Sequence, residues 1–279
     1  MVTVKLYGGL GNQMSQYAAG LALADKLGSA ISVDVTWFEE MRTNPHIITR
    51  REYELDIFEI YPRATTLRNR MNTLFDKPKT YKEKGLGYDP GFWKLSGNVV
   101  LDGHWLSYKY FNSRIHLIAE AFKFPSKVSK KNRDIIDNMQ TEASISVHVR
   151  RADYANDAYT KRLHGLTPLE YYLAAIKKMC AEVKSPVFYI FSDDIDWCRK
   201  NIKPKGKIIY VSHNNGAKSY EDMRLMAACK NNIIANSSFS WWGAWLNPRR
   251  DKIVIAPRQW RKDGLIKTHD MIPENWIVL

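Results

Sequence analysis

The chain has 279 residues, of which 45% are hydrophobic and 25% are charged, and its formal net charge is +13. This length suits two domains, and so high a hydrophobic content excludes a chain that is disordered as a whole. No run of residues is apolar for long enough to span a bilayer, and no signal-peptide pattern precedes the first strand-like segment, so we expect a cytoplasmic protein.

The positive charge narrows the possible binding partners. An excess of lysine and arginine favours nucleic acid, an anionic membrane surface or a phosphorylated substrate. Part of the excess lies in residues 63–84, which form either a solvated face or a contact with lipid headgroups.

Cys180, Cys198 and Cys229 fit neither a zinc site nor a disulfide framework, and we expect three reduced, buried thiols.

The N-terminal segment has the pattern of a β-turn-α-β unit. Residues 3–7 alternate as a strand, a glycine-rich turn and a helix to about residue 27 follow, and residues 31–35 form a second strand. Such units usually form parallel sheets. Residues 40–110 mix short apolar runs, prolines and aromatic residues, and we assign no elements there. A basic stretch then leads into a helix that ends near residue 140, where we place the boundary between domains 1–140 and 141–279.

The second half alternates strands and helices. Strands are predicted at 144–149, 187–191, 208–211, 233–235 and 253–256. Repeated β-α units predict a second doubly wound sheet, and two such sheets facing each other would enclose a cleft. Ligands of open α/β sheets bind beyond the carboxyl ends of the strands, and each motif described below follows a predicted strand.

Helix starts are predicted at three places in this half besides the one that follows Phe191. Thr167-Pro168-Leu169-Glu170 has the form of a capping box with proline at the first helical position. Ser219 and Asp222 open a second helix, and Ser237 or Ser238 opens an aromatic-rich third helix.

The glycine-rich turn, Gly8-Gly9-Leu10-Gly11-Asn12-Gln13, precedes the first helix. Gly9 and Gly11 would let a ligand approach the backbone, the helix N-terminus would present N–H groups to an anion, and Asn12 adds an amide. A nicotinamide-binding fingerprint is an alternative, with Asp34 near the position of a ribose-binding acid. Met14 stands where the third glycine belongs and would hinder close helix–strand packing. A tight turn without a ligand is the other alternative.

The His148-Val149-Arg150-Arg151-Ala152-Asp153 segment ends a predicted strand. Alternation places His148 and Arg150 on one side of that strand. The fork of an arginine matches two phosphate oxygens, and a fixed cation stabilises a departing nucleoside diphosphate more as its charge grows. Asp153 could orient an arginine or act as a base. A surface pair of arginine and aspartate is the structural alternative.

Two further strand ends carry polar residues. After Phe191, Ser192 and Asp193 could bind a guanine edge or a ribose diol, could cap a helix together with Asp194, or could join Asp196 in a metal cluster. We rank the metal site lower because Arg150 and a helix N-terminus already neutralise phosphate.

The third strand-to-helix junction begins at Asn236. Its hydroxyls and amides suit phosphate, and an aromatic ring there could stack on a base; the residues are Asn236, Ser237, Ser238 and Phe239. The tryptophans that follow at 241, 242 and 245 are expected to pack in the core.

These segments together resemble the α-1,2-fucosyltransferases of glycosyltransferase family 11 and, more distantly, the protein O-fucosyltransferases. The most specific part of the resemblance is the run from Asp222 to Leu246, which follows His148-x-Arg150-Arg151-x-Asp153 in the expected order. The resemblance covers the N-terminal turn and most of 144–256, whereas residues 40–125 are not matched. Ser15 stands where the family would have phenylalanine.

The resemblance implies a GT-B fold, with two Rossmann-like domains facing a cleft, and transfer of L-fucose from GDP-fucose with inversion and without a metal or cofactor. The expected acceptor is the 2-hydroxyl of a terminal galactoside in surface polysaccharide synthesis. The first domain would lie on the acceptor side, and the second would bind the GDP-sugar. A lipid-linked acceptor and peripheral contact with an anionic membrane would fit the basic 63–84 region.

The same analogy gives roles to single residues. Arg150 would hold the β-phosphate, assisted by Asn12, and His148 would lie near the ribose or the diphosphate. Ser192 and Asp193 would lie near the nucleoside. The phosphate and base would be contacted by Ser237, Ser238 and Phe239. Asp153 is the candidate base.

Three alternatives stay open. The donor could be another GDP-sugar such as GDP-mannose, because the motifs specify nucleotide and phosphate better than hexose. A nicotinamide-dependent oxidoreductase is disfavoured by Met14. A basic nucleic-acid-binding module has no fold signature to support it, so we expect no nucleic-acid partner.

Overall fold

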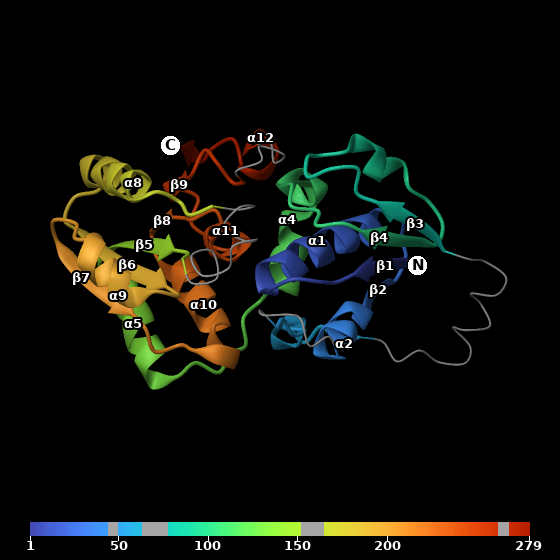
Figure 1. The fold of residues 1–279 in the computed structure, drawn as a ribbon, viewed down its shortest axis with the longest axis horizontal. Helices are drawn as coiled ribbons and strands as arrows, with labels where there is room; N and C mark the ends of the chain where they lie inside the picture. The colour runs from blue at the N-terminus through green and yellow to red at the C-terminus, as the bar shows by residue number, and fades with distance from the viewer. Residues whose placement is uncertain (44–49, 63–77, 152–164, 262–267) are drawn as a thin grey trace. The chain divides into compact units, whose positions relative to one another are not determined.

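The computed structural model describes residues 1–43, 50–62, 78–151, 165–261 and 268–279 (Figure 1). It contains two compact α/β units, Met1–Pro125 and Ser126–Leu279. The division falls earlier in the chain than the boundary predicted near residue 140. The reason is that helix α5 (Lys130–Thr141) packs against α10 (Tyr220–Ala228), and its buried Asn132 donates to Oε2 of Glu221 at 3.1 Å.

The first unit is built on a four-stranded parallel sheet in the order β2-β1-β4-β3. Its strands are β1 (Val2–Lys5), β2 (Ile31–Asp34), β3 (Lys79–Lys82) and β4 (Val99–Asp102). Among the described residues, its α-helices are α1 (Leu10–Lys26), α2 (Thr36–Thr43) and α4 (Ile115–Ala121). The predicted β-α-β start is confirmed, whereas β3 and β4 lie where no element was predicted.

Helix α1 packs against β1 through a glycine that the sequence analysis did not single out. A Cβ added at Gly20 would lie 2.1 Å from Cγ2 of Val4. Met14 is fully buried on the same helix. The close approach that a dinucleotide fold makes at its third glycine is therefore made here at Gly20, and Met14 does not prevent it.

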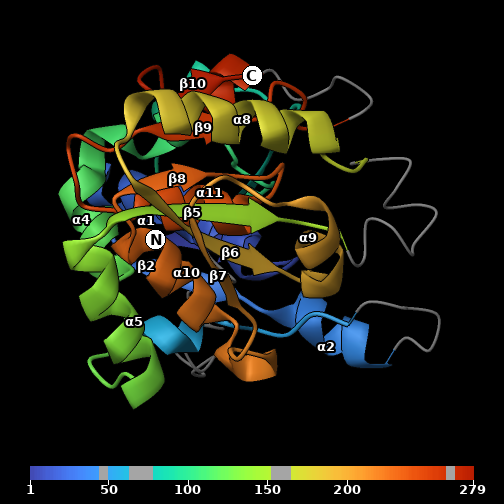
Figure 2. The ribbon, with the colours of Figure 1, turned by 90° about the vertical axis from the view of Figure 1, so that its left-hand side faces the viewer.

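The second unit contains a six-stranded parallel sheet in the order β10-β9-β8-β5-β6-β7 (Figure 2). Its strands are β5 (Ala143–Val149), β6 (Pro186–Ser192), β7 (Lys207–Val211), β8 (Asn231–Ile233), β9 (Val254–Ala256) and β10 (Ile277–Val278). The helices that the structure describes here, besides α5 and α10, are α8 (Leu169–Glu182), α9 (Ile195–Asn201), α11 (Ser238–Trp245) and α12 (Thr268–Met271). The predicted doubly wound sheet is confirmed, and β10 was missed.

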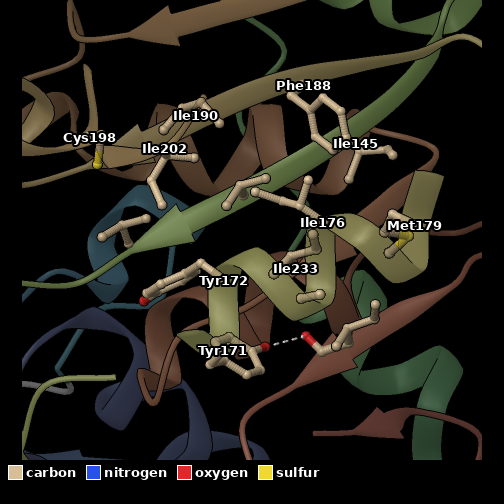
Figure 3. Close-up of a cluster of buried hydrophobic side chains, with 14 residues drawn as sticks. Ile145, Tyr171, Tyr172, Ile176, Met179, Phe188, Ile190, Cys198, Ile202 and Ile233 are labelled. Atoms are coloured by element: carbon tan, nitrogen blue, oxygen red, sulfur yellow. Dashed lines mark hydrogen bonds between the residues drawn. The ribbon is translucent and has the colours of Figure 1, made fainter. Parts of the chain in front are cut away.

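Two faces of this sheet are covered by different helices. Residues Ile145 and Val147 of β5 belong to a buried cluster with α8 and α9, in which Tyr171 donates to the carbonyl of Ile255 at 3.0 Å (Figure 3). Figure 2 shows α8 along one face and α10 along the other. Alternation turns Ser146 and His148 away from the α8 cluster, toward the face that holds α10 and α11.

The predicted capping box at Thr167 is wrong because its first side chain binds elsewhere. The Thr167 hydroxyl donates to Oδ1 of Asn236 at 2.8 Å, and Pro168 is the N-cap of α8 rather than its first helical residue. The predicted helix start at Ser219 is confirmed, because Ser219 is the N-cap of α10. Its side chain makes no cap bond, and Asp222 accepts from Nδ2 of Asn214 at 2.8 Å. Ser237, one of the two predicted choices, is the N-cap of α11.

Several surface expectations can be compared with the described residues. Cys198 and Cys229 are buried as predicted, but Cys180 is exposed on α8. Of the basic region 63–84, residues 63–77 lie outside the described residues. In the described part of the chain, no helix combines the length and apolar character that crossing a membrane requires.

Gly20→Ala is expected to lower the melting temperature. The added methyl would force α1 away from Val4, and overpacking costs about 1–3 kcal/mol, more than the roughly 1 kcal/mol that alanine gains over glycine in a helix. Circular dichroism would compare it with Gly85→Ala, whose Cβ would meet no described atom within 4 Å. Equal melting temperatures for the two variants would contradict this packing.

Candidate functional site

Three loops of the second unit meet at one edge of its sheet. Strand β5 lies between β8 and β6, and all three strands are parallel, so the residues that follow them share an edge. The chain builds β6 and β7 on one side of β5 and β8 to β10 on the other, so the strand order reverses beside β5. Open α/β sheets bind ligands at such a point.

Asp193 fixes both arginines that follow β5. Its Oδ2 pairs with Nη1 of Arg150 at 3.1 Å, and its Oδ1 accepts the backbone N–H of Arg151 at 2.8 Å. The side chains of Arg150 and Asp193 are 25% and 21% exposed. The carboxylate thus holds a partly buried guanidinium at the strand end, in a position to meet an anion.

Arg151 is held by a second set of contacts. Its Nε pairs with Oδ2 of Asp194 at 3.3 Å, and its guanidinium lies 4.0 Å from the ring centroid of Trp197. Asp194 also caps α9 by accepting the N–H of Trp197 at 3.1 Å, as predicted. Ser192 accepts the N–H of Asp194 at 2.9 Å. Arg151 and Asp194 therefore support the loops next to Arg150 structurally.

The alternative of a metal site at Asp193, Asp194 and Asp196 gains no support. Asp193 and Asp194 each pair with an arginine. Within the ranges that the structure describes, no group of three or more His, Cys, Asp or Glu side chains could hold a metal ion.

His148 is a buried neutral imidazole. It is 6% exposed, and burial and then the charge of Arg150 lower its pKa to about 3. Its Nδ1 has no hydrogen-bond partner among the described residues, and its ring centroid lies 5.8 Å from that of Phe239 on α11. At neutral pH it could therefore offer a hydrogen bond or packing to a ligand, but not a positive charge.

The residues at the start of α11 divide into two groups. Asn236 is 2% exposed, and its amide nitrogen donates to the carbonyls of Gly165 and Trp260, both at 3.3 Å. With its bond from Thr167, this side chain holds neighbouring loops together. Ser237 is also buried, whereas Ser238 and Phe239 are half-buried and are the residues of this junction that a ligand could reach.

A buried polar network lies at the end of β7 and was not predicted. Asn132 of α5 bonds His213 at 2.7 Å and Asn214 at 3.1 Å, and Asn214 in turn donates to Asp222 of α10. Burial raises the pKa of Asp222 to about 7, which the bond from Asn214 opposes and Glu221 reinforces. The signal in the sequence was the polar run after a strand, but its partners came from α5, far away in the chain.

The backbone N–H groups at the glycine turn of the first unit are partly bonded by the protein itself. Gly8 has a φ of +79°, which favours glycine, and α1 begins at Leu10. The N–H of Leu10 donates to Oε2 of Glu54 at 2.9 Å, so a carboxylate of the chain already occupies part of the helix N-terminus. The guanidinium of Arg51 lies beside Gly9, within 3.6 Å of where a Cβ would be.

The remaining predicted residues have different outcomes. Asn12 is half-buried in the first turn of α1, next to Gly11. Asp34 holds the start of α2, because its Oδ1 accepts the N–H and hydroxyl of Thr36 at 3.0 and 2.7 Å. Asp153 lies outside the described residues.

Comparisons with known proteins point to one family. The model of glycosyl transferase family 11 matches residues 1–279. An alpha-1,2-colitosyltransferase of Escherichia coli is 30% identical over 99% of this chain and 98% of its own length. The O-antigen biosynthesis glycosyltransferase WbnK of Escherichia coli is 32% identical over 91% of this chain and 93% of its own length. A galactoside alpha-(1,2)-fucosyltransferase 1 of Saimiri sciureus is 27% identical over 86% of this chain and 63% of its own length.

Asp222→Asn is expected to stabilise the fold more at pH 8 than at pH 5.5. The folded-state pKa of Asp222 is raised from 3.8 to about 7, so the folded chain holds a proton that the unfolded chain releases between these values. The free energy of unfolding therefore falls as the pH rises to about 7, and asparagine removes this loss. Melting temperatures at both pH values would show it, with the exposed Asp137→Asn as the control. A pH-independent difference would contradict the assignment.

Proposed function

The chain belongs to glycosyl transferase family 11, and from this premise we propose that it transfers L-fucose from GDP-fucose to the 2-hydroxyl of a terminal galactoside. Two relatives support the linkage and the setting. The Saimiri sciureus protein is named for galactoside α-(1,2)-fucosyl transfer, and WbnK is named for O-antigen biosynthesis. The proposed acceptor is accordingly a galactose-containing glycan of a surface polysaccharide or oligosaccharide.

The observation that carries the proposal is the Arg150–Asp193 pair beside the strand-order reversal at β5. As the bond between the anomeric carbon and the phosphate oxygen breaks, the diphosphate gains negative charge. A guanidinium that is already oriented by a carboxylate stabilises this charge without having to reorganise during the reaction. We assign the β-phosphate to Arg150 and the donor as a whole to the second unit.

The neighbours of Arg150 suit the rest of the donor. Phe239 offers a half-buried aromatic face, and Ser238 lies in the first turn of α11, where N–H groups favour an anion. His148 stays neutral next to Arg150, so the positive charge stays concentrated on the arginine. Asp193 is assigned to orienting Arg150 rather than to the nucleoside.

The proposed reaction is a single displacement with inversion. The acceptor hydroxyl attacks the anomeric carbon from the face opposite the diphosphate and gives up its proton, for which Asp153 is the candidate base. No metal is proposed, because the arginine supplies the charge that a divalent cation would otherwise provide.

A second donor is favoured by one specific relative. The Escherichia coli protein that matches 99% of this chain is named as an alpha-1,2-colitosyltransferase. Colitose is L-fucose without its 3-hydroxyl, so one site could accept either sugar unless a buried polar group requires that hydroxyl.

Arg150→Ala is expected to lower kcat about 10²–10³-fold, the usual loss when one preorganised donor to a developing anion is removed. The measurement is GDP release from GDP-fucose with a panel of β-galactosides in the presence of EDTA, together with product mass. Arg249→Ala is the matched control, because that arginine pairs with Asp251 at 3.0 Å on the surface. Release that needs Mn²⁺ would contradict the metal-free mechanism, and a chain that binds no GDP would overturn the proposed function.

Competition between GDP-fucose and GDP-colitose is expected to identify the donor. If a buried group binds the 3-hydroxyl, kcat/KM should favour fucose by about 10⁴-fold or more; without such a group, the two values should agree to within about 100-fold. GDP-mannose is included as the control for a wrong hexose. A preference for GDP-mannose would contradict the proposed sugar while leaving nucleotide binding intact.

A further inference from the structure

A second group of chemically active side chains lies at the carboxyl edge of the sheet in the first unit. Its centre is the turn Gly103-His104-Trp105, which follows β4. Glu83 follows the neighbouring strand β3, and its carboxylate accepts the N–H of His104 at 2.6 Å and that of Trp105 at 3.1 Å. One carboxylate therefore fixes the turn that carries His104.

The turn has an unfavourable conformation that these contacts maintain. Trp105 has a φ of +51°, in the left-handed region that bulky residues rarely occupy. A Cβ at Gly103 would lie 2.4 Å from Cβ of Glu83, so only glycine fits there. Burial raises the pKa of Glu83 to about 7. Backbone strain next to a desolvated carboxyl group is typical of binding and catalytic sites rather than of a plain connection.

The turn places His104 in a row of half-buried aromatic rings. The His104 and Tyr7 ring centroids are 5.0 Å apart with an interplanar angle of 84°, and Tyr7 and Trp37 are 6.1 Å apart. His104 and Tyr7 lie just after β4 and β1, and Trp37 lies in the first turn of α2, which follows β2; these three strands are neighbours in the sheet. All three are half-buried, so each ring keeps an accessible part.

Polar groups lie on the same face of the sheet as these rings. Alternation along β1 and β4 turns Val4 and Leu101 into the core, and turns Lys5 and Asp102 to the opposite face with Tyr7 and His104. Nζ of Lys5 pairs with Oδ2 of Asp102 at 3.2 Å, and both side chains are partly exposed. Tyr7 is also adjacent to Gly8 of the glycine turn.

This combination matches a neutral sugar better than a nucleotide. Aromatic rings pack against the C–H face of a pyranose, while carboxylate, ammonium and imidazole groups bond its hydroxyls. Lys5 and Asp102 neutralise each other, and Glu83 adds no positive charge, so this group of side chains has no net positive charge with which to attract a diphosphate. The cluster lies where a parallel sheet binds its ligands, at the carboxyl ends of the strands.

We propose that Tyr7, Trp37 and His104 form the subsite for the sugar ring of the acceptor, and that Glu83 is the positioning residue for His104. This inference rests on the proposed function and assigns its acceptor to named residues. In this proposal His104 contacts a neutral hexose directly, and Glu83 acts on the hexose only by fixing the turn that carries His104.

The test uses lactose as the acceptor probe and GDP-fucose as the donor, with the full chain. His104→Ala is expected to raise the KM for lactose about tenfold or more, while the dissociation constant of GDP changes less than about twofold. His116→Ala is the matched control, because His116 is exposed on α4 of the same unit. In the ¹⁵N-histidine-labelled chain, the imidazole resonance of His104 should shift saturably with lactose, and that of His116 should not.

Glu83→Gln separates positioning from simple support of the fold. The amide keeps one acceptor and opposes one N–H with an NH₂ group, so the turn should loosen and the KM for lactose should rise with GDP affinity unchanged. Glu83→Ala at a temperature where it stays folded should raise that KM further.

The outcomes distinguish the subsite from the proposed function. A chain that binds no GDP overturns both. If the chain binds GDP but no hexoside in a panel that includes lactose shifts the His104 resonance, the proposed subsite alone is overturned. A His104→Ala variant with unchanged KM for lactose does the same.

Discussion

The ion pair between Arg150 and Asp193 is the contact on which the candidate donor site depends. It joins the ends of β5 and β6, and the same carboxylate also accepts the N–H of Arg151. Removing Asp193 would take away this orienting contact and the acceptor of the Arg151 N–H. The pair lies beside the reversal of strand order, where backbone direction already favours ligand binding. The orientation of the guanidinium is therefore fixed before a substrate binds, which is the condition for stabilising charge that develops during a reaction.

The two units differ in the charged groups that lie at the carboxyl ends of their strands. In the second unit, arginines follow β5 and an imidazole stays neutral next to them, so positive charge is concentrated. In the first unit, Glu54 already satisfies the N–H of Leu10 at the glycine turn, and Glu83 holds the turn after β4. In the first unit carboxylates thus stabilise the turns next to the aromatic rings that we propose for a neutral sugar, whereas in the second unit an arginine is oriented for the proposed phosphate. This division agrees with a transferase that binds a charged donor and an uncharged acceptor.

The sequence predicted the elements whose hydrophobic pattern is long and regular. Strands β5 and β6 are seven-residue runs with buried interiors, and both were located to within a residue or two. Strand β3 reads Lys-Thr-Tyr-Lys and is mostly exposed at the sheet edge, so it carries no hydrophobic signal, and β4 is too short to stand out. The motif after β5 was identified by residue type. The partners of its side chains were not, because Thr167 bonding Asn236, and Asn132 bonding Asn214, join residues far apart in the chain. Those choices are made by tertiary packing, and no local pattern encodes them.

Titration of GDP and of guanosine into the wild-type chain and into Arg150→Ala by calorimetry tests the central claim most directly. If Arg150 holds the diphosphate, the variant should bind GDP more weakly and lose most of the difference in affinity between GDP and guanosine. Its affinity for guanosine itself should stay the same, because guanosine lacks the phosphates that Arg150 is proposed to hold. Unchanged GDP affinity, or equal weakening of GDP and guanosine, would contradict the assignment of the phosphate to Arg150 and with it the account of the donor site.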